Sequence, residues 1–183
     1  TIPYGPLLGE TPVEVTPTPF TNKTNLAKYV QGYMAQKYGS CEVSGYKWGE
    51  KMGAAGMKRW DCSILFNQDV KWSLDDALPD PKWIKKPGMI EPTVVSINTV
   101  FHEHLHATSK ISSFPSVYKN PWGRWLEEGT VQMLSTRETQ KFMLERYGYN
   151  IEKKIVSNFC YTMEMQSITT LEKYIGPEGI LAI

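Results

Sequence analysis

The three histidines of the 183-residue chain all lie in one short stretch, VFHEHLHA at residues 100–107. On a helix, His102 and His106 are one turn apart and share a face, and Glu103 lies beside them. Two imidazoles at this spacing could hold a metal ion, and the adjacent carboxylate could take a proton from a water on that ion. On a strand, His102, His104 and His106 would instead all point the same way. The kind of site therefore depends on the secondary structure of this stretch.

The sequence around these histidines favours a helix. Apolar residues recur at intervals of three, four and four along the segment 91–110: Val94, Ile97, Phe101 and Leu105. That spacing is typical of a helical face, Pro92 suits the first turn of a helix, and the segment is about three times as long as an average strand. We therefore predict a helix on which His102 and His106 lie about 40° apart. His104 would lie about 160° from His106, so we expect it to point away from the metal and to be packed or solvated.

A catalytic zinc site needs a third protein ligand besides the two histidines, with one position left for water. No histidine follows His106, so this ligand must be a carboxylate or a thiolate. The three cysteines are scattered and form no CxxC pair, which argues against a thiolate. The best carboxylates are Glu127 and Glu128 in PWGRWLEEGTVQ, and Glu128 follows His106 by 22 residues on a second predicted helix.

Taken together, HEHLH at 102–106 and PWGRWLEEGT at 121–130 resemble the minimal pattern of the gluzincin metallopeptidases. In these peptidase MA-like and thermolysin-type enzymes, HExxH is followed by a short loop and by a helix with the pattern tryptophan-leucine-x-Glu-Gly. The match covers about 30 of the 183 residues and is unspecific for substrate. The resemblance implies a zincin-like fold and hydrolysis of peptide bonds.

The resemblance also implies a site, residue by residue. Zn²⁺ would be held by His102, His106 and Glu128, because the glutamate directly before the glycine is the third ligand in the family pattern. Glu103 would be the catalytic general base, acting on the water rather than on the metal. Glu127 would then occupy a variable position.

The chain departs from the thermolysin-type pattern in two ways. Those enzymes carry, one turn after the ligand glutamate, an aspartate that orients a histidine. This chain has Gln132 there, so any such carboxylate must come from elsewhere. No further histidine exists to stabilise the oxyanion, so a tyrosine must do so, as in other relatives. Tyr118, between the two motifs, is the first candidate for this catalytic role, and Tyr161 and Tyr147 follow.

The N-terminal half is predicted to hold the strands of the fold. Residues 1–20 contain five prolines and indicate an extended lead-in or linker, with a propeptide as the alternative. The segments that follow are expected to form a helix, a hairpin or small sheet, and an irregular connection: the helix from Thr21 or Asn22 to Gly39, β-rich stretches at 41–48 and 59–67, and the connection over 68–92.

The C-terminal half is predicted to be mostly helical. The helix over 120–134 is expected to lead into a new helix at Ser135, because Ser135 and Glu138 have the spacing of a capping box. That helix should end at Gly148. Two further helical stretches are expected, at 151–165 and 169–175.

We therefore predict an α+β, zincin-like fold with one domain over residues 21–183. It would combine a small N-terminal β-sheet, the active-site helix and a mostly helical C-terminal half. The net charge of +1 does not indicate nucleic-acid binding, and no apolar run is long enough to span a membrane. The expected partner is a protein or peptide substrate, with neither nucleic acid nor a membrane span. The missing initiator Met suggests a processed form or a domain of a larger, secreted or delivered protein.

Two other functions remain open. The first is a metalloenzyme of another class, such as a hydratase or a dioxygenase, with three histidines on one strand. The second is a catalytically silent zincin-like module that only binds a partner, since a fold does not imply an activity. The presence of both histidines and of Glu103 argues against the silent module.

Overall fold

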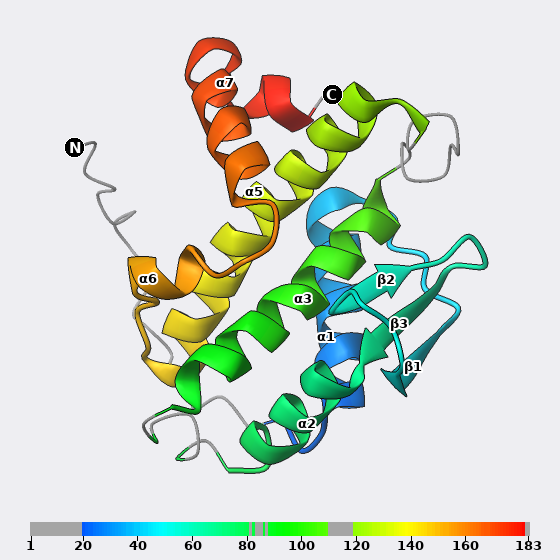
Figure 1. Cartoon of the computed structure of the whole chain (residues 1–183), viewed down its shortest axis with the longest axis vertical. Helices are drawn as coiled ribbons and strands as arrows, with labels where there is room; N and C mark the ends of the chain where they lie inside the picture. The colour runs from blue at the N-terminus through cyan, green and yellow to red at the C-terminus, as the bar shows by residue number, and fades with distance from the viewer. Residues whose placement is uncertain (1–19, 81, 83–85, 87, 110–118, 182–183) are drawn as a thin grey trace.

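Long helices make up most of the molecule, and a small three-stranded sheet lies at one side of them (Figure 1). The computed structural model describes residues 20–80, 82, 86, 88–109 and 119–181. The α+β class is therefore confirmed at this coarse level. The predicted lead-in over 1–20 lies outside the described residues apart from Phe20, and the domain boundary after it stays a prediction.

The first helix, α1 (Lys23–Tyr38), confirms the helix expected from Thr21 or Asn22 to Gly39. The Asn22 side chain caps its start by accepting a hydrogen bond from the Asn25 N–H at 2.9 Å. Gly39 ends it with φ at +96°, which a glycine adopts without strain. One face of α1 is fully buried in the core: Leu26, Ala27, Val30 and Met34.

The sheet has the order β1-β3-β2 and is built from short strands: β1 (Gly45–Glu50), β2 (Gly56–Lys58) and β3 (Ser63–Asn67). β1 runs parallel to β3, and β2 runs antiparallel to it. The predicted β-rich stretches at 41–48 and 59–67 thus contain parts of β1 and β3, whereas β2 lies between them. β1 and β2 are the two edge strands, and β2 lies against α3 (Figure 1).

The irregular connection predicted over 68–92 is wrong in its first part, because α2 (Gln68–Ala77) is a helix. The Asn67 side chain caps it by accepting from the Val70 N–H at 3.0 Å. Val70, Leu74 and Ala77 then fall on one buried face. The prolines that suggested a loop all come after this helix.

The central helix is α3 (Ile90–Thr108), which confirms the helix predicted over 91–110. Its predicted apolar stripe is buried: Val94, Ile97, Phe101 and Leu105. α1, α2 and β2 pack on one side of α3, and α5 packs on the other (Figure 1). The alternative with three histidines on one strand is therefore wrong, because this stretch is helical.

The second long helix, α5 (Pro121–Tyr147), is continuous, so the predicted helix start at Ser135 is wrong. The Ser135 hydroxyl donates to the Gln132 carbonyl within the helix at 3.0 Å and caps nothing. The Glu138 carboxylate turns to α1 instead, where it accepts hydrogen bonds from Tyr33 and Tyr38 at 2.5 and 2.6 Å. The predicted end is confirmed, because Gly148 closes the helix in the left-handed region at φ +61°.

Two elements complete the described chain: α6 (Lys153–Val156) and α7 (Thr162–Leu181), whose helical backbone is interrupted by a kink at Gly176. The helices predicted at 151–165 and 169–175 are thus only partly correct, since the chain leaves the helix between α6 and α7. α7 packs closely on α5 at Gly129, where an added Cβ would lie 2.9 Å from the Glu164 carbonyl oxygen and 2.7 Å from Ile168. None of the helices in the described ranges is long and apolar enough to cross a membrane.

Candidate metal centre

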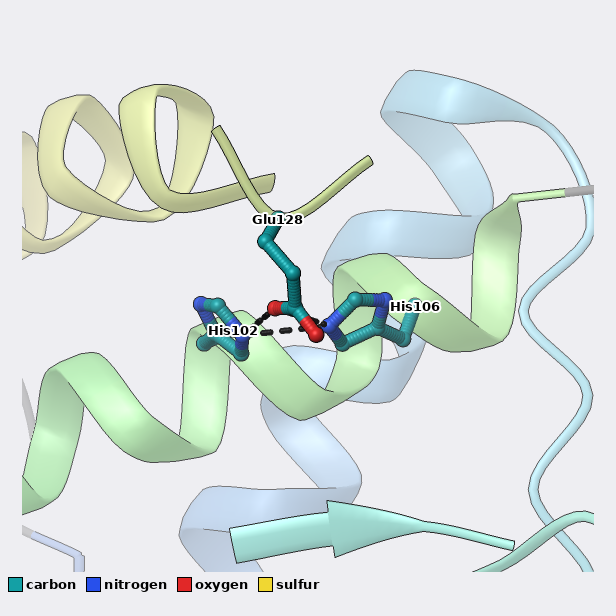
Figure 2. A group of neighbouring side chains, drawn as sticks. All are labelled: His102, His106 and Glu128. Carbon is teal, nitrogen blue, oxygen red and sulfur yellow. Dashed lines mark hydrogen bonds and ion pairs between the residues drawn. The ribbon is translucent and has the colours of Figure 1, made fainter. Parts of the chain in front are cut away.

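His102 and His106 lie one turn apart on α3, and Glu128 points from α5 into the space between their rings (Figure 2). The Nε2 atoms of the two histidines are 3.1 Å apart, and Glu128 Oε2 lies 3.3 Å from each of them. All three side chains are buried. These three residues are the ones predicted from the sequence as metal ligands. Within the described residues, their side chains lie close enough together to hold a metal ion.

The spacing of these three atoms fits a tetrahedral zinc ion. Zinc lies about 2.0–2.1 Å from its nitrogen and oxygen ligands, so two ligands at a tetrahedral angle are about 3.3–3.4 Å apart. The observed separations of 3.1–3.3 Å are close to that value. Two imidazoles and one carboxylate also suit zinc better than magnesium or calcium, which prefer oxygen ligands alone.

The electrostatics of the group favour a bound cation. Burial by itself would raise the pKa of Glu128, but the hydrogen bonds and charges of His102 and His106 lower it to about 2. Burial would lower the pKa of His106, but the hydrogen bonds to Glu127 and Glu128 raise it to about 10. The carboxylate is therefore ionised and draws positive charge between the rings, where a metal ion could replace the proton.

Glu127, the neighbour of the predicted ligand, also contacts the centre. Its Oε1 lies 3.0 Å from His106 Nδ1, the ring nitrogen that faces away from Glu128. A carboxylate in this position fixes the ring and its tautomer, so that Nε2 is left for the metal. Glu127 is thus the orienting carboxylate that Gln132 could not supply. The signal in the sequence was the adjacent pair itself, because neighbouring helical residues point about 100° apart and can face both nitrogens of one ring.

Gln132 has a different function in the structure. Its amide donates to Asn98 on α3 at 3.0 Å and to the Thr136 hydroxyl at 3.1 Å. The buried contact with Asn98 joins α3 to α5. In contrast to His106, His102 leaves its Nδ1 buried without a hydrogen-bond partner in the described part of the chain. The protein therefore orients the two rings by different means.

Glu103 lies beside the three predicted ligands and contacts the sheet. Its Oε2 accepts a hydrogen bond from the backbone N–H of Lys58 in β2 at 2.7 Å. Burial is the main cause that raises its pKa above the ordinary value, and Glu128 adds to it, while His102, His106 and the Lys58 N–H act against it. A carboxylate whose pKa is raised is a stronger proton acceptor.

His104 is packed, as predicted, and takes no part in the centre. It is fully buried, its Nδ1 lies 2.7 Å from the Val100 carbonyl oxygen, and its Nε2 lies 3.0 Å from the Tyr46 hydroxyl. Burial lowers its pKa to about 4, so the ring is neutral. The carbonyl can only accept, so Nδ1–H donates to it and Nε2 accepts from Tyr46.

Of the three candidate tyrosines, Tyr161 is the one found at the centre among the described residues. Tyr118 lies outside the described residues. Tyr147 is half-buried beside Phe142, with ring centroids 5.9 Å apart. Tyr161 stacks on the His102 ring, with centroids 5.8 Å apart and planes at 11°. Burial and the nearby Glu128 raise its pKa, and it shares a hydrogen bond with the Arg124 side chain.

The backbone around Tyr161 explains how it reaches His102. Tyr161 directly precedes α7 and has φ at +55°, a conformation that is uncommon for a residue with a side chain. The start of α7 is held against α5 at Gly129, the residue after Glu128. The glycine of the E-E-G motif therefore brings together the elements that carry Glu128 and Tyr161.

No protein-family model, curated protein or solved structure matches the chain. The geometry of the centre therefore carries the functional assignment.

Proposed function

We propose that the protein is a zinc-dependent metallopeptidase of the gluzincin type with a zincin-like fold. The observation that carries the proposal is the convergence of His102, His106 and Glu128 on one point, with the Glu103 carboxylate beside them. Neither the metal group nor the base alone would indicate hydrolysis. Their combination in a buried site supplies both a Lewis acid and a proton acceptor.

In this proposal the residues of the site have separate functions. When bound, zinc lowers the pKa of a water and polarises the carbonyl of the scissile peptide bond. His102, His106 and Glu128 hold the ion, and Glu127 keeps Nε2 of His106 directed at it. Glu103 accepts the proton of the attacking water and passes it to the amine that leaves.

The oxyanion partner in this proposal is Tyr161, which replaces Tyr118 as the first candidate. Burial keeps the phenol protonated at neutral pH. An arginine side chain has no acceptor, so Arg124 donates to the phenol oxygen. The phenol hydrogen is then left to donate to the carbonyl oxygen of a substrate, where charge develops in the transition state.

The proposal is tested with the purified protein in two steps. Elemental analysis should find one zinc per chain after dialysis against a zinc-containing buffer. The zinc-loaded protein should then cleave members of an unbiased peptide library, with products identified by mass spectrometry, and removal of zinc by a chelator should abolish cleavage. Zinc binding without cleavage of any peptide would indicate the silent binding module instead.

A further inference from the structure

The edge strand β2 touches Glu103 at a position where only glycine fits. A Cβ built on Gly56 would lie 2.6 Å from Glu103 Cγ, 2.8 Å from Glu103 Oε1 and 2.8 Å from Thr99 Cγ2, both residues of α3. Side-chain atoms do not approach one another so closely without displacement. Gly56 has no left-handed backbone, so the need for glycine here is a need for space. The absence of a side chain at residue 56 is therefore what admits Glu103 between α3 and β2.

The same strand also holds the Glu103 carboxylate. Next to Lys58, the Arg59 N–H donates to the Ser63 carbonyl at 2.8 Å, and at the other end of β2 the Asn67 N–H donates to the Ala55 carbonyl at 3.0 Å. Because groups alternate along an antiparallel strand, the N–H of Lys58 points away from β3. It donates to Glu103 Oε2 at 2.7 Å. The Lys58 N–H thus donates to the candidate base and not to a neighbouring strand.

We propose that Gly56 and the backbone of Lys58 are positioning residues that keep the Glu103 carboxylate off the metal and on the water. This inference rests on the proposed function. Glu103 is adjacent to His102 in the sequence, and a flexible carboxylate beside two imidazoles is attracted to them. Anchored at the Lys58 N–H, it lies outside the group formed by His102, His106 and Glu128.

The first test compares two glycines of the same region. An added Cβ at Gly56 collides with Glu103, whereas one at Gly53 meets no atom within 4 Å. G56A should keep its zinc and lower kcat about 10²-fold with KM little changed, the cost of misplacing a catalytic group by about 1 Å. G53A should behave as wild type. Equal kinetics for G56A and G53A would overturn the proposal.

The second test separates the backbone of Lys58 from its side chain and does not require G56A to fold. Proline is tolerated on an edge strand where the N–H takes no part in the ladder. K58P removes the donor to Glu103, and K58A keeps it. K58P should lose most of the kcat at full zinc content, while K58A should keep it; an equal loss in the two variants would contradict the positioning function.

A third measurement distinguishes this inference from the peptidase proposal. K58P should lower the Tm by roughly 2–10 °C, the range for a lost buried contact in a chain of this size, and should lower it less when Glu103 is already alanine. This coupling is measurable even if the zinc-loaded protein cleaves no peptide, which would refute only the proposed function. Equal Tm losses from K58P in the wild type and in E103A would refute the anchoring of Glu103 by β2.

Discussion

The two sides of the candidate site are built in different ways. On the metal side, the donors come from two helices: His102 and His106 face one way because they are one helical turn apart, and Glu128 meets them where α5 lies beside α3. On the base side, Glu103 is held by the N–H of a strand residue that lies 45 positions earlier in the chain. The metal side follows from the geometry of α3 and its packing on α5. The base side depends on the packing of β2 against α3.

This difference has a consequence for function. The metal side can remain intact when the base side is disturbed, because none of its three donors contacts β2 in the interactions described above. Zinc binding and hydrolysis should therefore be separable by mutation. The reverse does not hold, since in the proposed mechanism Glu103 acts on a water that requires the metal.

The largest effect is expected on the metal side, from E128A. This change removes one of the three proposed ligands and leaves two buried imidazoles, so the purified variant should lose its zinc. E127A removes only the partner of His106 Nδ1 and should weaken zinc affinity by about 10–100-fold while the site still fills at saturating zinc. Metal titration of both variants checks this ranking. If E127A loses zinc and E128A keeps it, the ligand is Glu127.

The next effect is expected on the base side, from E103Q. Glutamine keeps the size of the side chain and an oxygen that can accept from the Lys58 N–H, but it cannot take a proton. Zinc should stay bound, and hydrolysis should fall by about 10²–10⁴-fold. Metal content and activity must be measured on the same sample. Full activity in zinc-loaded E103Q would refute the mechanism.

A smaller effect is expected from Y161F, which removes a single hydrogen-bond donor. Loss of one oxyanion donor lowers kcat by about 10²–10³-fold in other hydrolases. The phenylalanine ring can still stack on His102, so zinc content should not change. The control is Y174F on α7, where the side chain is 84% exposed and its loss should have no effect. Equal kcat values for Y161F and Y174F would return the oxyanion function to Tyr118 or to another group.

The comparison of the two sides also shows what could be predicted from the sequence. The shared face of His102 and His106 and the end of α5 at Gly148 are consequences of local geometry, and both predictions are confirmed. The E-E-G motif predicted Glu128 as the third metal ligand. The structure turns this residue, and not Glu127, towards both Nε2 atoms.

Where no motif marked a contact between distant segments, the predictions were wrong or absent. Ser135 and Glu138 have the spacing of a capping box, but α1 supplies Tyr33 and Tyr38 as partners for Glu138, and the helix continues. The docking of Gly56 and Lys58 on Glu103 had no local signal. A glycine that is needed for space looks the same in a sequence as a glycine in a loop.

The smallest effect on the site is expected from H104Q, although His104 lies between the two predicted ligands. Its ring points away from them, to Val100 and Tyr46, so zinc content and kcat should match the wild type. The cost should appear in stability, because the buried His104 ring loses its hydrogen bonds with the Val100 carbonyl and the half-buried Tyr46 hydroxyl, and such a loss is worth about 1–3 kcal/mol. Denaturant unfolding of H104Q, Y46F and the double variant measures the coupling of the pair, and H102Q provides the metal-binding control. A folded H104Q variant that loses zinc while H102Q keeps it would place the metal on the opposite face of α3 and would overturn the assignment of both sides.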